Sequence, residues 1–345
     1  MALFDTPYRK AGMALLLGVG LILPLVAGNQ LLHIFNLTML VIVGALALNL
    51  LTGFAGQLSL GHAAFLGVGG YVSHFVSQAG IPFPLVVLAA TAFGGALGFL
   101  VGAPALRLRG LYIVLATVGF HYIVLYLIHV YQSSGEDSIL ALTGFLMPEA
   151  DLGFVVLDSA VRWFYFLGGV LILTTAFCLN LARTRVARAW IALRERDITA
   201  AALGINLAVY KLKAFVVSSA LACMAGSLLV YYLGSVSAEY YTLDLAVSYL
   251  AMVVIGGYGS IFGSYLGACF IALMPFFITW LFEFFEASPR TQVQLLVPSQ
   301  VIVFGLVMIG FLIFEPRGLI GIWRRIRVYF ELWPLSRSIL AVRRD

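Results

Sequence analysis

Residues 31–62 read LLHIFNLTMLVIVGALALNLLTGFAGQLSLGH and combine two features that decide the fold. Up to Leu51 the stretch is apolar and carries no Asp, Glu, Lys or Arg, and its length suits a helix that crosses the hydrocarbon core of a bilayer. From Gly53 onward, glycines and polar residues interrupt the apolar run. Because lipid cannot satisfy free peptide groups, irregular backbone at membrane depth must be buried in protein or line a cavity. The stretch therefore predicts a membrane-spanning chain with a break beside one span.

The composition extends this prediction to the whole chain. Of the 345 residues, 62% are hydrophobic and 10% are charged, whereas a soluble domain carries about 25% charged residues. The sequence predicts an all-α integral membrane protein forming one transmembrane domain over residues 1–345, without a separate soluble catalytic domain. The first apolar run is long enough to span, so we interpret it as a retained helix and not as a cleaved signal peptide. Ten spans are expected, at 11–28, 31–51, 59–79, 83–104, 111–131, 161–182, 213–233, 241–256, 261–283 and 297–314.

The basic residues predict the orientation of these spans. With ten spans, all of the 20 lysines and arginines except Arg162 and Arg290 fall on the side that holds both termini. Positive charge gathers on the cytoplasmic side of membrane proteins, so both termini are expected there. The net charge of +5 is thus a topology signal and does not indicate nucleic-acid binding. The largest opposite loop, 133–160, is acidic, and we interpret it as a solvated loop or as a docking surface for a soluble partner.

A second glycine-rich break, at 256–263, occupies a position in the second half of the chain comparable to that of 53–62 in the first half. Such paired breaks indicate two pseudo-repeated halves and a translocation path. The alternative is close helix packing without substrate contact. His62 is open to both interpretations, with Gln57 and Ser59 as possible partners, and a packing role is favoured. The candidate path residues are Gly56, Gln57, Ser59, Gly61, His62, Gly256, Gly257, Gly259 and Ser260.

The expected cytoplasmic loop at about 183–213 has the pattern of two short amphipathic helices. Thr184 and Asp197 are suitable N-caps, and Gly204 is suitable for the end of the second helix. Trp190 and Leu193 lie three residues apart, so they share one helix face that a partner could contact. Candidate coupling residues are Arg188, Trp190, Leu193, Glu195, Asp197 and Gly204. The tail, at about 315–345, has the spacing of an amphipathic helix that lies in the inner membrane interface.

The residues that could carry chemistry do not form a catalytic or metal site. Cys178, Cys223 and Cys269 lie far apart in apolar runs, without metal-ligand or redox spacing. The chain also contains no phosphate-binding G-x-x-x-x-G-K-[ST] loop. We therefore expect no enzyme activity, no cofactor and no metal in this chain.

Three motifs carry a resemblance to a known family. Gly-Gln-Leu-Ser-Leu-Gly-His at 56–62, Gly-Gly-Tyr-Gly-Ser at 256–260 and Ala-Leu-Gly-Ile-Asn ending at Asn206 resemble the M-type subunit of bacterial branched-chain amino acid importer permeases. The similarity covers about residues 30–320.

What this resemblance implies is a type II ABC importer permease of the bacterial inner membrane. Two cytoplasmic ABC ATPase subunits, a second homologous permease and a periplasmic substrate-binding protein would be its partners. Residues 187–204 would be the coupling helices, and ATP hydrolysis would take place in the ATPase subunits.

Other functions fit the sequence less well. Related permeases import urea, short amides or aromatic acids, and this sequence does not separate those solutes. An ion-coupled secondary transporter usually places Asp, Glu or Lys within its spans, but the middle of every predicted span here lacks them. A membrane-embedded enzyme would need catalytic acids, histidines or nucleophiles clustered at one depth, and the sequence shows no such cluster.

The predicted topology can be tested with reporter fusions. Fusions after Arg109, Arg196 and Arg344 are expected to report the cytoplasm, and a fusion near Asp151 the outside, because positive charge marks the inner side. Alkaline phosphatase and fluorescent-protein activities provide the two readouts. Two or more reversed reports would discard the ten-span map.

Overall fold

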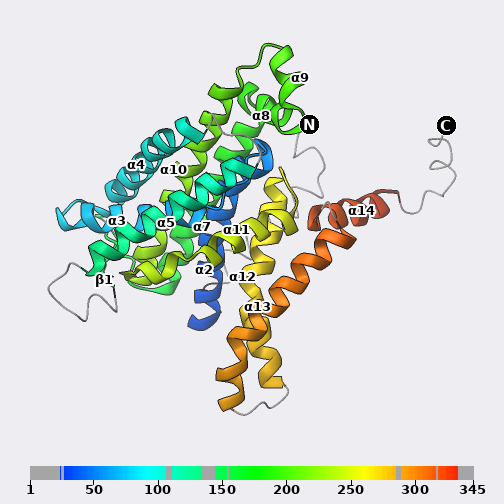
Figure 1. Ribbon diagram of the computed structural model, residues 1–345. Helices are drawn as coiled ribbons and strands as arrows, with labels where there is room; N and C mark the ends of the chain where they lie inside the picture. Colours follow the sequence, from blue (N-terminus) through cyan, green and yellow to red (C-terminus); the bar gives the residue numbers. More distant parts are fainter. Residues whose placement is uncertain are drawn as a thin grey trace.

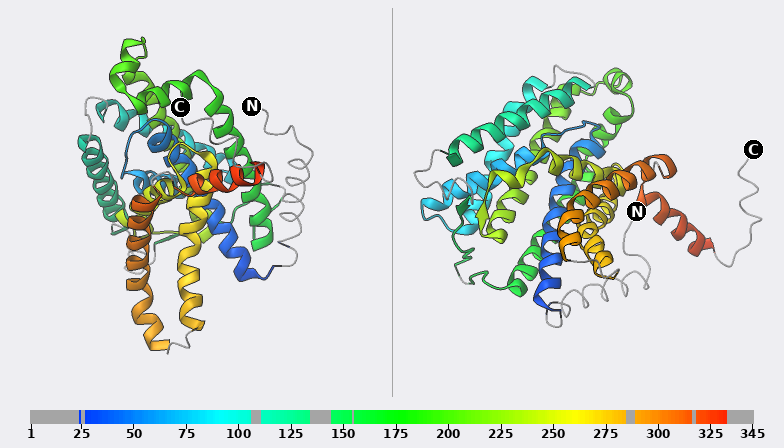
Figure 2. Two further views of the ribbon diagram at one scale, coloured as in Figure 1. Left: turned by 90° about the vertical axis from the view of Figure 1, so that its right-hand side faces the viewer. Right: turned by 60° about the horizontal axis from the view of Figure 1, so that its bottom comes forward.

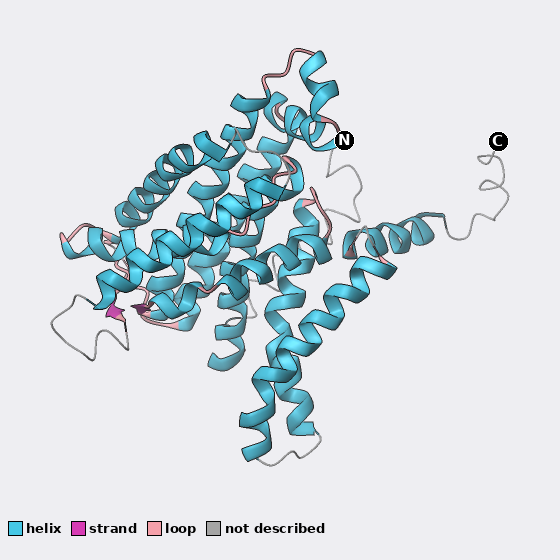
Figure 3. Cartoon of the chain, in the orientation of Figure 1, coloured by secondary structure: helices cyan, strands magenta, loops and turns pink. Residues whose placement is uncertain are grey.

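The computed structural model describes residues 24, 27–105, 111–133, 144–153, 155–284, 289–315 and 318–332. Helices dominate these residues, and two short strands accompany them (Figures 1 and 3). The helices that precede the predicted cytoplasmic loop are α2 (Asn29–Leu48), η1 (Asn49–Phe54), α3 (His62–Gln78), α4 (Phe83–Ala105), α5 (Leu111–Ser133) and α7 (Ala160–Arg183). The elements that follow are α8 (Arg185–Glu195), α9 (Asp197–Ala202), α10 (Leu207–Leu233), η2 (Ala238–Tyr241), α11 (Leu243–Gly256), α12 (Ile261–Phe284), α13 (Pro289–Phe314) and α14 (Leu319–Leu332), and the strands are β1 (Phe145–Leu146) and β2 (Ser235–Val236).

Six helices among the described residues are long and apolar enough to cross a membrane, which confirms the prediction of an all-α membrane protein. They cover Asn29–Phe54, Phe83–Pro104, Tyr112–Ser133, Ala160–Arg183, Leu207–Leu233 and Ile261–Phe282. The predicted spans 59–79, 241–256 and 297–314 also coincide with helices, although α3 has 17 residues and α11 has 14. The first predicted span, 11–28, lies largely outside the described residues. The count of ten spans therefore stays a prediction.

Helix α10 forms the centre of the bundle. It packs along α4, α3 and α2, and 72% of its spanning window is buried, against 22% for α7. Small residues allow this close approach: a Cβ atom on Gly226 would overlap the carbonyl oxygen of Leu66, and one on Gly69 would overlap that of Cys223. In a bilayer, association of helices depends on such backbone contact, because lipid is as apolar as the helix surfaces. The α10 helix begins at Leu207, earlier than the predicted 213, because the side chain of Asn206 accepts a hydrogen bond from the Val209 amide.

Both predicted breaks are present as irregular backbone. After α2 the chain continues into η1, a buried π-helical turn, and then into a loop that leads to α3. After α11, Gly257 and Gly259 have positive φ angles of 113° and 69°, which glycine adopts without steric cost. Helices α11 and α12 then cross in direct contact, since a Cβ on Gly267 would overlap the carbonyl oxygen of Met252.

The remaining elements mark the two ends of the bundle. Helices α8 and α9 lie at one end, and the antiparallel β1–β2 pair, with Phe145 opposite Val236, lies at the other (Figure 1). The α12–α13 hairpin extends beyond the rest of the molecule (Figure 2). The predicted tail helix is present as α14, whose Trp323 ring packs against Phe262, while residues 333–345 lie outside the described part of the chain.

The contact between α3 and α10 predicts a strong effect of Gly226→Ala. The new methyl group would meet the backbone of Leu66, which cannot move aside, and overpacking of this kind costs about 1–3 kcal/mol. The midpoint of thermal unfolding in detergent is expected to fall. Gly168→Ala on α7 is the matched control, because a Cβ there meets no atom within 4 Å. Equal midpoints for the two variants would contradict this account of the packing.

Candidate functional site

The two glycine-rich breaks meet at the side chain of Asn49. Its amide nitrogen donates hydrogen bonds to the Ser260 carbonyl oxygen at 2.9 Å and to the Ser264 hydroxyl at 2.7 Å. Its amide oxygen accepts a hydrogen bond from the Gly259 N–H at 3.0 Å. Asn49 is 1% exposed, so this one side chain satisfies buried polar groups of a segment more than 200 residues away.

The absence of side chains at the surrounding glycines lets the two breaks approach. A Cβ on Gly53 would lie 2.5 Å from the Gly259 nitrogen and would overlap the amide oxygen of Asn49. A Cβ on Gly259 would lie 2.9 Å from the Gly53 carbonyl oxygen. At Gly53 and Gly259 the lack of a side chain therefore allows the two backbones to come into contact.

Helix α8 reaches the same place through Arg194. This residue lies on the helix surface, but its Nη1 donates a hydrogen bond of 2.6 Å to the Gly53 carbonyl oxygen. Its stem crosses Gly56, where a Cβ would lie 2.9 Å from Arg194 Cγ. Sequence reasoning missed both Asn49 and Arg194. Asn49 lies in an apolar run and Arg194 in a basic loop, and neither context indicates a long-range partner.

The polar residues of the first motif are directed at different neighbours. The Gln57 amide donates to the Lys211 carbonyl oxygen at 3.2 Å, near the start of α10. The Ser59 hydroxyl accepts from the Gly61 N–H at 3.3 Å, and a Cβ on Gly61 would lie 3.0 Å from the Thr117 carbonyl oxygen on α5. The first motif thus connects η1 and α3 with α10 and α5.

His62 lies inside the bundle, 2% exposed, with its ring edge-on to Tyr249 at 4.9 Å between centroids. The partners expected from the sequence, Gln57 and Ser59, bond elsewhere. Its Nε2 has no hydrogen-bond partner among the described residues. The ring therefore packs between α3 and α11.

A comparison with known protein families identifies the family of this chain. The model of the family described as "Branched-chain amino acid transport system / permease component" matches residues 30–312. The chain belongs to this family. It is 29% identical over 341 residues to the high-affinity branched-chain amino acid transport system permease protein LivM of Escherichia coli (strain K12), and 30% identical to LivM of Salmonella typhimurium. Each alignment covers 93% of this chain and 77% of the relative. No solved structure matches the chain significantly.

The family membership confirms the function predicted from the sequence. The chain is a transport subunit, the permease component of a branched-chain amino acid transport system, and a multi-pass inner-membrane protein. Among the residues that the structure describes, no group of three or more His, Cys, Asp or Glu side chains could hold a metal ion.

The helix pair expected in the loop of the permease is present, with one correction. Thr184 caps α8, accepting from the Ala187 N–H, and Gly204 follows α9 with φ 82°, as predicted. Asp197, however, stands in the first turn of α9 and not at its cap, and its carboxylate pairs with Lys211 at 2.6 Å. This ion pair fastens α9 to the start of α10.

The helix face that contains Trp190 and Leu193 is buried against another helix of the permease itself. Trp190 is fully buried and its indole N–H donates to the Tyr210 carbonyl oxygen at 2.8 Å, while Leu193 is 3% exposed. The expectation that these two side chains contact a partner is therefore wrong, because α10 covers the apolar face of α8. Two large apolar side chains of the same segment are instead exposed: Ile198, 87% exposed, and Leu203, 75% exposed.

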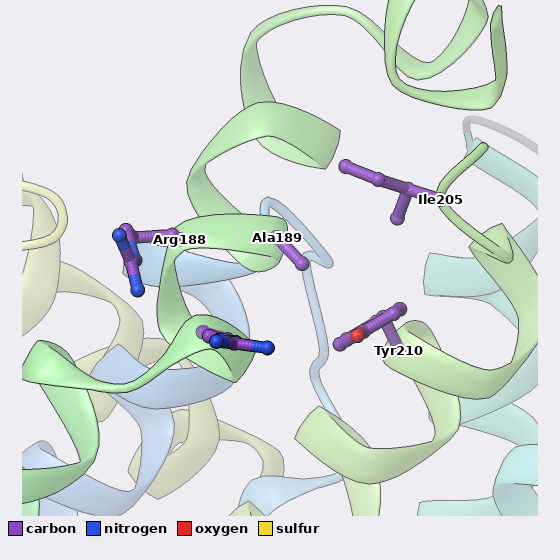
Figure 4. Close-up of a pocket in the computed structure, with 5 residues that line it drawn as sticks. Arg188, Ala189, Ile205 and Tyr210 are labelled. Atoms are coloured by element: carbon purple, nitrogen blue, oxygen red, sulfur yellow. The ribbon is translucent and has the colours of Figure 1, made fainter. Parts of the chain in front are cut away.

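A shallow groove lies beside this outward surface (Figure 4). It has a volume of about 400 Å³ and is lined by Arg185, Arg188, Ala189, Ile205 and Tyr210. Figure 4 shows the labelled side chains of Arg188 and Tyr210 on opposite sides of the opening. The groove combines two positive charges with an aromatic and an aliphatic wall, a lining suited to a partner's acidic and apolar side chains.

The junction at Asn49 predicts a loss of stability in Asn49→Ala. Without the amide, the buried Gly259 N–H and the Ser264 hydroxyl lose partners, and an unsatisfied buried group costs about 1–3 kcal/mol. Thermal unfolding in detergent, monitored by size-exclusion chromatography, is expected to show a lower midpoint. Asn180→Ala, at an exposed position of α7, provides the control. An unchanged midpoint for Asn49→Ala would show that the junction contributes little.

Proposed function

We propose that this permease is the membrane subunit of an ATP-driven importer and forms half of the translocation path for branched-chain amino acids. Two ABC ATPase subunits would bind it from the cytoplasm and hydrolyse ATP, a second homologous permease would complete the path, and a periplasmic binding protein would deliver the substrate. The carrying observation is the rigid helix pair α8–α9 with outward apolar side chains at one end of the bundle. Family membership and the names of both relatives favour branched-chain amino acids over urea or amides.

The proposed architecture has ten spans in two pseudo-repeated halves, with both termini in the cytoplasm. Its support is the position of the basic α8–α9 segment at one end of the bundle and of β1, which belongs to the acidic segment 133–160, at the other. Each of the segments 53–62 and 256–263 follows one helix and precedes another, the first in the first half of the chain and the second in the second half. A single permease domain, comprising residues 1–345, then includes the coupling loop and the interfacial tail helix α14.

The path is proposed to run beside the two breaks, at Gly56, Gln57, Ser59, Gly61, His62, Gly256, Gly257, Gly259 and Ser260. These residues lie where four elements converge, and their contacts are between backbones or through single side chains. Small relative movements of the elements would change the close contacts at this convergence, where the backbones of Gly53 and Gly259 approach each other. Such a position suits a gate that opens and closes with each transport cycle.

The ATPase contact is proposed on the outward surface of α8 and α9, made by Arg188, Glu195, Ile198, Leu203 and the groove at Arg185. Ile198 and Leu203 are exposed on a segment that the ion pair Asp197–Lys211 and the buried Trp190 hold in place. A pre-ordered apolar tip binds with little loss of conformational entropy, and its central side chains dominate the binding energy.

This contact can be tested with Ile198→Asp and Leu203→Asp. A charge introduced at the centre of an apolar contact is expected to cost about 2 kcal/mol or more, which weakens binding of the ATPase about thirtyfold. Co-purification and titration of the ATPase subunit against the detergent-solubilised permease give the measurement. Leu146→Asp, equally exposed but on β1 at the other end, is the control. Wild-type affinity in both Ile198→Asp and Leu203→Asp would place the contact elsewhere or remove the ATPase from the proposal.

A further inference from the structure

A single arginine connects the cytoplasm-facing helix α8 with both breaks of the translocation path. Arg194 Nη1 donates to the Gly53 carbonyl oxygen at 2.6 Å. The same guanidinium group lies beside Gly259, since a Cβ there would be 2.5 Å from Arg194 Nη1. Gly53 belongs to η1 and Gly259 to the loop between α11 and α12, so the arginine touches two segments that belong to different halves of the chain.

The contact can transmit movement because its parts are bonded to their neighbours. Helix α8 is fixed to α10 by the buried Trp190, and Gly53 and Gly259 are fixed to each other through Asn49. The guanidinium group of Arg194 connects α8 to Gly53 through a hydrogen bond. It comes from the helix surface, so it can form and break without unpacking the core. A hydrogen bond with a charged donor is also stronger than a neutral one.

We propose that Arg194 is a positioning residue for coupled transport: its hydrogen bond to Gly53 makes the two breaks of the path follow the movement of α8. The inference rests on the proposed binding of the ATPase to α8 and α9. When the bond is present, a displacement of α8 carries Gly53 and, through Asn49, Gly259 with it. Without the bond, the direct connection from α8 to Gly53 is lost, and the path follows the movement of α8 less closely.

The test uses the complete importer, with both permeases, the ATPase subunits and the binding protein, reconstituted in liposomes. Leucine uptake and ATP hydrolysis are measured together. In Arg194→Met the ATPase is expected to remain bound and to hydrolyse ATP, while leucine imported per ATP falls about tenfold, the effect of losing one hydrogen bond to a charged group. Arg194→Lys keeps a cationic donor of similar reach, and its coupling ratio is expected to return to within about threefold of the wild type.

Two further variants separate coupling from folding and from surface charge. Arg196→Met removes a neighbouring exposed arginine whose side chain makes no hydrogen bond or ion pair among the described residues, and its coupling ratio is expected to match the wild type. Arg194→Gln keeps a polar side chain that is too short for the bridge, and it is expected to resemble Arg194→Met, which provides a second measurement if the methionine variant does not assemble.

The outcomes distinguish this inference from the proposed function. A wild-type coupling ratio in Arg194→Met or Arg194→Gln, with the ATPase bound, would overturn the role of Arg194 and leave the importer intact. Equal loss in Arg194→Lys and Arg194→Met would also overturn it, because the donor would not matter. If the ATPase fails to bind the wild-type permease, the proposed function itself fails.

Discussion

The need to satisfy backbone polar groups away from water controls this structure. A spanning helix meets that need within itself, but the two breaks at η1 and after α11 leave N–H and C=O groups without helical partners. The amide of Asn49 supplies bonds to the second break, and the guanidinium of Arg194 supplies one to the first. The two breaks are thus held by side chains from other parts of the chain, Asn49 for the second break and Arg194 for the first. Their meeting place connects η1, the loop after α11 and α8.

The second constraint is close packing without a hydrophobic driving force. The permease meets it with glycines at helix crossings, where α3 approaches α10 and α11 approaches α12 with backbones in contact. Large apolar side chains instead cover the outer faces of α4, α5 and α12, as expected of surfaces that face lipid. Small residues thus determine which helices pack together, and large apolar side chains form the surface that contacts lipid.

Helix positions were predictable from the sequence, but the partners of their faces were not. Apolar runs such as 83–104 and 161–182 coincide with α4 and α7 because length and hydropathy alone determine them. The prediction that Trp190 and Leu193 share one helix face was also correct. A periodic pattern, however, does not indicate which segment covers that face. Here α10 of the same chain covers it. The bonds between Asn49 and Ser264 or Gly259 join residues more than 200 positions apart, and no local signal indicates them.

The π-helical turn at η1 gives the first break a property that a plain loop would lack. A π turn holds more residues than an α turn, and the segment Asn49–Phe54 places this wider turn at the C-terminal end of α2, directly before the loop that leads to α3. If the segment were rewound as α-helix, Gly53 and the loop behind it would rotate about the axis of α2, because an α turn completes its circle with fewer residues. Asn49 begins this turn and Gly53 lies within it. The register of α2 and the connection between the two breaks are therefore one mechanical variable.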